Sequence, residues 1–191
     1  RERLEMIKDN MVDSASIRHT TLRVDLRRKI VQPFMDEIVL ESQVSLYIND
    51  HHYSIMTVTP SEIRELAIGH LIAEGIINRM DEILELKISK GKVDIRLSKE
   101  PPIEKTGIIS TECGSGKRRM TSRIWMKLKN QGSSIRFASQ AIIEAVKNLN
   151  SSAEIYRKTG GTHAAALMDE RGNILAISED ISRHSAVDKV I

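Results

Sequence analysis

Cysteine and aromatic residues are scarce in this chain, and long apolar runs are missing. Among its 191 residues there are one cysteine and six aromatic side chains. A single thiol excludes an internal disulfide framework. So few aromatic rings argue against a protein that stacks nucleic-acid bases on repeated Phe, Tyr or Trp side chains. No stretch approaches the roughly 20 apolar residues of a membrane span and no apolar leader is visible, so we expect a cytoplasmic protein that binds neither membrane nor nucleic acid.

Pairs of metal-binding residues at the usual spacing are also missing. The single cysteine and the six scattered histidines form no CxxC or HxxxH pair of the kind that zinc sites use. A zinc-dependent deaminase needs an HxE element and a PCxxC element, and the sequence contains neither. We therefore expect that the protein binds no metal of its own.

Positive charge is unevenly distributed along the chain. The formal net charge is +3, and residues 1–29 already supply it with eight basic and five acidic residues. Residues 113–143 contain seven basic residues and no acidic one. Such a run is typical of a solvated basic helix face, but this one begins at the only cysteine, so binding of an anion is an equal alternative.

The chain divides near Pro101–Pro102 into two regions of mixed strand and helix patterns. We predict a polar helix or linker over residues 1–20 and a β-rich subdomain with one helix over 21–100. The region 103–191 is expected to form an α/β core. The overall class is therefore α/β, or α+β, with the smaller β-rich part first.

Turn and cap signals locate individual elements. The stretch "NDHH" (49–52) predicts a turn between two strands, and "KGK" (90–92) predicts a β-hairpin. In "TPSE" (59–62), Thr59 as N-cap, Pro60 at the first helical position and Glu62 closing a capping box predict a helix start. Further patterns predict a short strand near "TGIIS" (106–110), helices over 117–130 and 138–149, a strand–turn–strand over 159–180 and a final helix in "ISRHSAVDKVI" (181–191).

The lone cysteine stands in "STECGSGK" (110–117), between Glu112 and Gly114, and three consecutive cations begin four residues after it. A helix N-terminus and nearby Lys or Arg side chains favour the thiolate, and they would equally stabilise a persulfide anion on Cys113. Gly114 and Gly116 let the backbone approach a partner closely. A buried, inert cysteine is the alternative, but Gly, Ser and Lys are unusual neighbours for one, so we favour a reactive thiol.

The stretch "TGGTH" (159–163) predicts a tight glycine turn before a strand. Gly160 and Gly161 could present backbone N–H groups to a phosphate or carbonyl, as anion-binding nests do. A purely structural turn explains them equally well. His163 alone is more typical of a hydrogen-bonded core histidine than of a catalyst.

The stretch "SEDISRHSAVDK" (178–189) combines carboxylates with a histidine. On a helix Asp180, His184 and Asp188 would share one face, and Glu179 would reach Arg183. Carboxylates beside His184 would hold it in one tautomer and suit it to acid–base work. Ordinary helix electrostatics explains the same pattern, so both interpretations stay open.

Together these stretches resemble the FdhD family of sulfur carriers that serve formate dehydrogenase maturation. The resemblance runs from about residue 36 to the end of the chain. It rests on four strings: "LAIGHLIAEGII" (66–77), "STECG" (110–114), "TGGTHAAALMDERGNIL" (159–175) and "EDISRHSAVDKVI" (179–191). It implies a cytidine-deaminase-like three-layer core and a homodimer. It also implies an activity, in which a cysteine desulfurase loads sulfur as a persulfide that is delivered to the molybdenum or tungsten bis-pterin guanine dinucleotide cofactor of formate dehydrogenase.

The resemblance also assigns roles to residues. Cys113 matches the cysteine that bears the persulfide. The local charge places Lys117 and Arg118 near the cofactor. The resemblance places five further residues near the cofactor or the sulfur-transfer cavity: Gly160, Gly161, His163, Arg183 and His184.

Two features differ from the family pattern. Where the family has Cys-Gly-x-Cys-Gly, this chain has Gly116 at the second cysteine position, so it lacks a resolving thiol. The chain also ends at "DKVI", before a region that in the family contributes to guanine dinucleotide binding, and we expect that region to be missing. A cofactor chaperone that carries no sulfur is therefore the second hypothesis. Nucleic-acid binding through residues 113–143 is a third, more distant one.

Overall fold

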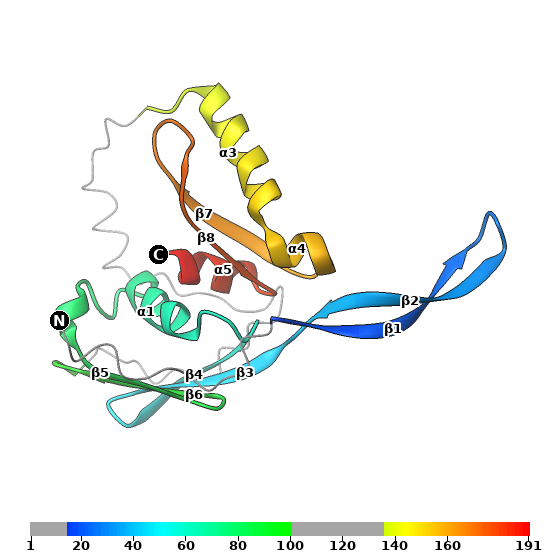
Figure 1. The fold of residues 1–191 in the computed structure, drawn as a ribbon. Helices are drawn as coiled ribbons and strands as arrows, with labels where there is room; N and C mark the ends of the chain where they lie inside the picture. The colour runs from blue at the N-terminus through cyan, green and yellow to red at the C-terminus, as the bar shows by residue number, and fades with distance from the viewer. Residues whose placement is uncertain (1–14, 101–135) are drawn as a thin grey trace, which may run out of the picture.

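The computed structural model describes residues 15–100 and 136–191. Their strands form three sheets: the pair β1–β2, the four-stranded sheet β4-β3-β6-β5 and the pair β7–β8 (Figure 1). Helices pack between and beside these sheets, which confirms the α+β class. None of the helices in these two stretches is both long and apolar enough to cross a membrane.

The four-stranded sheet is built from two hairpins whose inner strands run parallel. Its strands are β3 (Ser42–Ile48), β4 (His51–Val58), β5 (Ile83–Ser89) and β6 (Lys92–Leu97). The first hairpin turns through Asn49 and Asp50 at φ 48° and 66°, and the second turns at Gly91 at φ 71°. Asn and Asp tolerate these left-handed conformations better than most residues. Both turns were predicted from the sequence and are confirmed.

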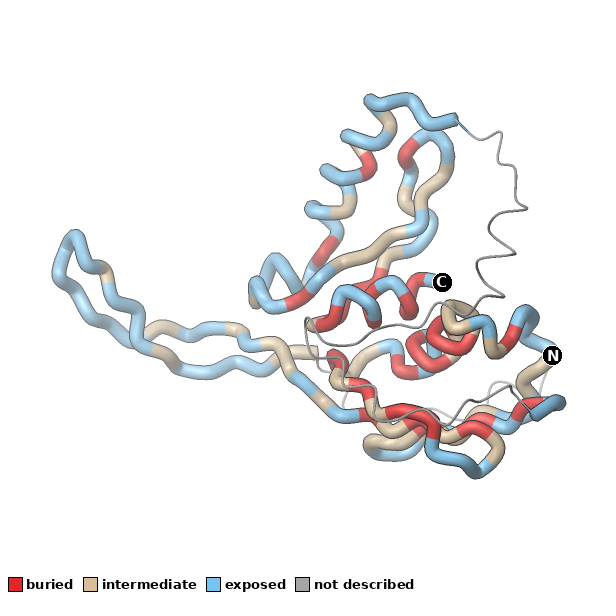
Figure 2. The backbone as a smooth tube through the Cα atoms, turned by 180° about the vertical axis from the view of Figure 1, so that it is seen from behind, coloured by how far each residue is buried: buried red, intermediate tan, exposed pale blue. Residues whose placement is uncertain are grey.

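Helix α1 (Ile63–Ala73) covers one face of this sheet and builds the hydrophobic core with it. Val93, Ile95 and Leu97 alternate along β6 and are buried, while Asp94 and Arg96 point away from that core. Leu66 and Leu71 of α1 are fully buried against them. Period-two strands packed under an apolar helix face therefore account for most of the buried core (Figure 2).

A second layer lies on the other side of α1. Helix α5 (Arg183–Val190) packs between α1 and the pair β7 (His163–Met168)–β8 (Ile174–Asp180). Helices α3 (Ser139–Ser152) and α4 (Glu154–Thr159) follow one another along this pair (Figure 1). The sequence predicted α3, β7, β8 and α5, but it gave no signal for the short α4.

The first two strands form an arm. β1 (Ser16–Asp25) and β2 (Ile30–Val39) pair antiparallel over their whole length and project from the body (Figure 1). Strand pairing begins at Ser16, within the stretch for which the sequence predicted a polar helix or linker. Residues 37–48 are divided between β2 and β3, because the first strand belongs to the arm and the second to the four-stranded sheet.

The predicted capping box at the start of α1 is wrong. The helix begins at Ile63, its N-cap Glu62 has a left-handed φ of 52°, and no side chain caps it. Thr59 is fully buried, and its hydroxyl accepts a hydrogen bond from Ile181 N at 3.1 Å. A tertiary contact more than a hundred residues away along the chain thus takes the oxygen that local patterning assigned to the helix.

Candidate functional site

The two ends of helix α5 differ in their exposure to solvent. Arg183 and His184 of its first turn are exposed, whereas Asp188 and Lys189 of its last turn are buried. Ser182 is the N-cap, and its hydroxyl accepts a hydrogen bond from Ser185 N. The helix therefore places one guanidinium and one imidazole at the surface while its other end is fixed in the interior.

The buried end is held by an ion pair between Lys189 and Asp180. Lys189 Nζ lies 2.8 Å from Asp180 Oδ2, and both side chains are completely inaccessible to solvent. The ammonium also donates to the main-chain oxygens of Thr59 at 3.1 Å and Glu179 at 3.3 Å. Because several acceptors surround it, this lysine satisfies the condition under which a buried charge is tolerated.

Asp180 is the other centre of this network. Its carboxylate accepts hydrogen bonds from Thr59 N at 3.0 Å and from Ser182 N at 2.8 Å. Burial raises the pKa of Asp180 above its ordinary value. Lys189 and these two N–H donors act to lower the pKa, but they do not cancel the effect of burial. Asp180 is also the last residue of β8 rather than part of α5. The predicted helical spacing between Asp180 and His184 is therefore wrong.

A second buried polar contact joins α1 to α5. His70 Nδ1 lies 2.9 Å from Asp188 Oδ2, and the two side chains are 5% and 2% exposed. Among the residues that the structure describes, no hydrogen-bond partner is found for the buried His70 Nε2. Gly69 makes this approach possible, because a Cβ added there would lie 1.7 Å from the main-chain oxygen of Asp188.

The glycine turn follows α4. Gly160 is its C-cap at φ 67°, and a Cβ at Gly160 would meet nothing within 4 Å. The N–H groups of the turn are used internally, since Gly160 N donates to Tyr156 O at 2.7 Å and Gly161 N to Thr159 Oγ1 at 3.1 Å. In this conformation neither N–H points toward an external phosphate. Any anion bound at this turn would therefore have to be held by side chains and not by these N–H groups.

Glu179 anchors the glycine turn to the strand pair. Its carboxylate accepts hydrogen bonds from Ile155 N at 2.8 Å and Tyr156 N at 2.7 Å, so it serves the first turn of α4. The hydroxyl of Thr162 donates to the same carboxylate at 2.9 Å. Glu179 lies in β8 and is buried, so the predicted helical pair with Arg183 does not describe it.

The β7–β8 register brings the two sequence motifs together. His163 opens β7 and pairs with Asp180 at the end of β8, three residues before Arg183. His163 is exposed, as are Gly160 and Gly161. The glycine turn, His163 and the start of α5 thus meet at one end of the strand pair, which we call the glycine-turn edge (Gly160, Gly161, His163, Arg183 and His184). Exposed guanidinium and imidazole groups there suit an anionic ligand.

Three predicted site residues, Cys113, Lys117 and Arg118, lie outside the described residues. The structure therefore tests neither the thiol nor its cations. Within residues 15–100 and 136–191 no group of three or more His, Cys, Asp and Glu side chains is arranged to hold a metal ion.

The region that contains these elements also matches a known protein family. The profile of the FdhD/NarQ family matches residues 39–191. The chain belongs to the FdhD/NarQ family. The match includes α1, the glycine-turn edge and α5, so the buried seam between α1 and α5 lies within the part shared with the family.

Individual relatives of this FdhD/NarQ chain agree with that assignment. It is 32% identical over 170 residues to "Sulfur carrier protein FdhD" of Methanothermobacter thermautotrophicus, covering 88% of this chain and 65% of the relative. It is 31% identical over 158 residues to the protein of the same name from Sulfolobus acidocaldarius, covering 82% and 61%. The chain thus spans less than two thirds of the length of these curated relatives.

A solved structure shows the same fold. A candidate formate dehydrogenase accessory protein from Desulfotalea psychrophila matches with a TM-score of 0.63 and 20% sequence identity, covering 92% of this chain and 67% of that one. At this identity the likeness supports the fold of the FdhD/NarQ chain and not its chemistry.

Sequence reasoning missed the residues that fix the family's helix α5. Thr59, His70 and Lys189 each contact an element distant in the sequence. One signal was present in the sequence. The string "LAIGH" places a glycine and a histidine inside an apolar helix, where a close contact with another part of the fold is needed to explain each of them. The close approach of Asp188 to Gly69 and His70 supplies that reason.

Proposed function

We propose that this chain is a sulfur carrier that accepts sulfur from a cysteine desulfurase as a persulfide on Cys113. It delivers that sulfur to the molybdenum or tungsten bis-pterin guanine dinucleotide cofactor, which formate dehydrogenase requires. The observation that carries the proposal is the FdhD/NarQ match over residues 39–191, which contains the lone cysteine in "STECG". The names of the relatives, sulfur carrier proteins, support the same activity. The cofactor is a client here, and we expect the protein to act in the cytoplasm as a homodimer with a cytidine-deaminase-like core.

Loading of Cys113 is a simple exchange. The thiolate attacks the outer sulfur of the desulfurase persulfide, the sulfur–sulfur bond of the donor breaks, and the donor leaves as a thiolate. Cys113 then carries the additional sulfur, and no external oxidant or reductant is needed. A second cysteine is not required for this step, so Gly116 is compatible with loading.

The glycine-turn edge supports the binding of an anionic client. Arg183 and His184 are exposed on α5, and His163 is exposed at the adjoining end of β7. Space beside Gly160 lets a ligand approach the backbone. We expect side chains of this edge, together with Lys117 and Arg118, to contact the phosphates of the client.

Intact-mass analysis tests sulfur loading. The chain is incubated with a cysteine desulfurase and cysteine, beside Cys113→Ala as the control. A gain of one sulfur atom that disappears in the control and on reduction with a thiol supports the carrier role. If the mass does not increase under conditions that load a two-cysteine relative, this chain does not carry sulfur.

A non-catalytic cofactor chaperone is the second candidate, and Gly116 is the observation that favours it. Binding of guanosine diphosphate, which carries the guanine and the phosphates of the dinucleotide, separates the two. A chain that binds this probe through Arg183 but never gains sulfur is a chaperone, whereas loading of Cys113 establishes the carrier.

A further inference from the structure

Two consecutive carboxylates of β8 hold the two halves of the glycine-turn edge. Neighbouring residues of a strand point to opposite faces of the sheet, so Glu179 and Asp180 serve different sides of the β7–β8 pair. On one side Glu179 binds the first turn of α4 and the hydroxyl of Thr162. On the other side Asp180 binds the N-cap residue of α5 and Lys189 in its last turn. The glycine turn and the start of α5 are therefore placed by the side chains of two adjacent residues.

Glu179 joins both ends of the segment 155–162, which contains the glycine turn. Its Oε2 accepts a hydrogen bond from Ile155 N at 2.8 Å, and its Oε1 accepts from Tyr156 N at 2.7 Å. The same Oε1 accepts from the hydroxyl of Thr162 at 2.9 Å. Glu179 is 7% exposed and Thr162 is 6% exposed, so water competes little for these bonds. One buried carboxylate thus fixes where the turn begins and where it ends.

Thr162 is the residue through which Glu179 reaches the exposed part of the edge. It is buried, whereas its neighbours Gly161 and His163 are both exposed. On the other side of the turn, a Cβ added to Gly161 would lie 2.6 Å from Val39 Cγ1, so the turn also packs closely against β2. The turn is therefore held in one place without a ligand. Such preorganisation reduces the entropy that is lost when a ligand binds.

We propose that Glu179, acting through the hydroxyl of Thr162, is a positioning residue for the anionic client at the glycine-turn edge. Both side chains are buried, so they act by fixing the exposed residues beside them. A carboxylate near an anion site repels the anion. Glu179 can therefore favour binding only through the groups that it holds in place. This role rests on the proposed binding of an anionic client at that edge, and it names the side chains that set the shape of the edge.

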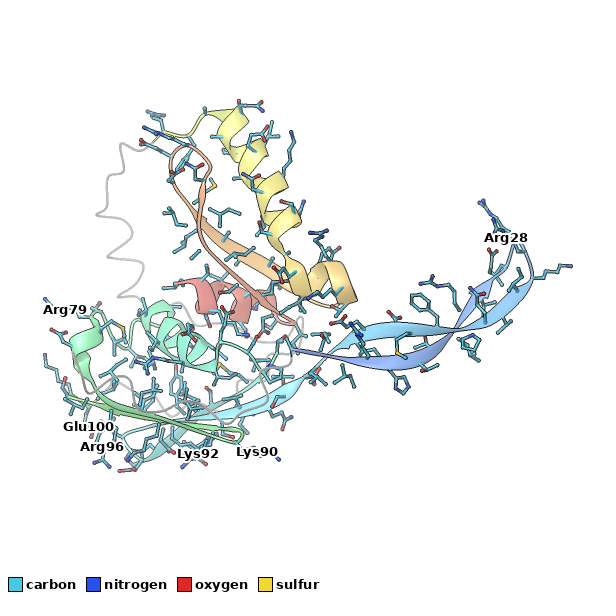
Figure 3. The ribbon with its side chains drawn as sticks, in the orientation of Figure 1. Arg28, Arg79, Lys90, Lys92, Arg96 and Glu100 are labelled. Atoms are coloured by element: carbon cyan, nitrogen blue, oxygen red, sulfur yellow. The ribbon has the colours of Figure 1, made fainter. Side chains whose placement is uncertain are left out.

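Cations of the four-stranded sheet provide a comparison. Figure 3 shows Lys92 and Arg96 on the side of that sheet that faces away from α1, far from α4. Lys92 Nζ lies 2.7 Å from Asp94 Oδ1, and Arg96 Nη2 lies 3.5 Å from Asp50 Oδ2. A general attraction of phosphate to positive charge would include these cations, whereas a site formed by the glycine-turn edge would not. Arg96→Gln is therefore the control for binding elsewhere on the surface.

Isothermal titration calorimetry of the whole chain with guanosine diphosphate tests the positioning role. Thr162→Val removes the hydroxyl that donates to Glu179 and keeps a branched side chain, whereas Thr162→Ser keeps the hydroxyl. We expect the Kd to rise about 10-fold for Thr162→Val, the equivalent of one net hydrogen bond, and to stay within about twofold for Thr162→Ser. Urea unfolding of the same samples shows that each variant is folded, so a hydroxyl that served stability alone would leave the Kd unchanged.

Glu179→Gln separates positioning from charge by the sign of its effect. Loss of a negative charge alone would tighten the binding of an anion. Glu154→Gln measures that contribution, because it removes an exposed carboxylate from the first turn of the same helix α4. Loss of positioning would instead weaken binding. We expect the Kd for guanosine diphosphate to rise about 10-fold in Glu179→Gln, and to stay the same or fall slightly in Glu154→Gln.

Several results would overturn the positioning role. They are an unchanged Kd in Thr162→Val, tighter binding by Glu179→Gln, and a loss in Thr162→Ser as large as that in Thr162→Val. A Kd that rises equally in Arg96→Gln would show binding elsewhere on the surface and refute it too. An unchanged chain that does not bind guanosine diphosphate refutes the anion-binding edge and this role with it. Loading of Cys113 is read separately by mass, so failure of sulfur transfer and failure of the positioning role are distinguishable.

Discussion

Replacement of Gly69 by alanine is expected to separate the two helices that the structure joins most closely. The added Cβ would lie 1.7 Å from Asp188 O and 2.7 Å from Asp188 C. Ordinary contact between carbon and oxygen needs about 3.3 Å, so α5 must move by about 1.6 Å. Both atoms belong to the main chain, so no side-chain rotation can relieve the contact.

The free energy of the change follows from three effects. Overpacking of a tight contact costs about 1–3 kcal/mol. The same movement stretches the buried hydrogen bond between His70 and Asp188, which measures 2.9 Å, and loss of such a bond costs about 1–3 kcal/mol. Alanine favours the helix over glycine by about 1 kcal/mol in the opposite direction. The net destabilisation expected is about 3 kcal/mol, a large fraction of the about 5–15 kcal/mol by which a domain is stable.

Urea unfolding followed by circular dichroism measures this change. Glu65→Ala is the control, because Glu65 lies on the exposed side of the same helix. The control is expected to change the free energy of unfolding by less than about 0.5 kcal/mol. A Gly69→Ala chain as stable as the unchanged one, or more stable, would refute the close crossing of α1 and α5.

Other variants test the contacts around α5 separately. Lys189→Met leaves Asp180 buried without its cation and is expected to cost about 3–5 kcal/mol in urea unfolding, part of which Asp180→Asn should restore in the double variant. Glu179→Gln weakens the hydrogen bonds from Ile155 N and Tyr156 N and is expected to cost about 2 kcal/mol, with the loss of amide protection confined to α4 and the glycine turn. Hydrogen bonds from the side chain and main chain of Asn173 lower the pKa of Asp169. The stabilisation of that turn is therefore present above the ordinary carboxyl range and lost as the pH falls through the lowered pKa, and Asn173→Ala should move the loss to higher pH in an NMR titration.

The local elements were predictable where the signal is local. The turns at Asn49–Asp50 and near Gly91, the helix α3 and the hairpin β7–β8 follow from turn residues and periodicity, and the structure confirms them. The grouping of these strands into separate sheets was less predictable from the sequence. The arm was not predicted, because its strands alternate like the strands of the body and only their pairing partners distinguish them.

The candidate site divides in the same way. Gly160 as a turn residue was predictable, since a left-handed φ after a helix favours glycine. The roles of Thr59 and His70 were not, because each is defined by a partner more than a hundred residues away. At Thr59 a capping pattern pointed to a local role, but its hydroxyl accepts a hydrogen bond from Ile181 N instead. Its main-chain N–H donates to the buried carboxylate of Asp180, which would be costly to leave unpaired in the interior.

The segment that most resembles the family therefore contains two kinds of residue. Asp180, Asp188 and Lys189 of "EDISRHSAVDK" are buried and hold α5 against α1 and Thr59, whereas Arg183 and His184 of the same string stand at the surface. Loss of activity in a variant of the first group is expected simply because the helix moves. Loss of activity in a variant of the second group, at unchanged stability, locates chemistry or binding at the glycine-turn edge. The two groups lie close together between the end of β8 and the last turn of α5, so the free energy of unfolding has to be measured beside the activity before any of these residues is assigned a role in sulfur transfer.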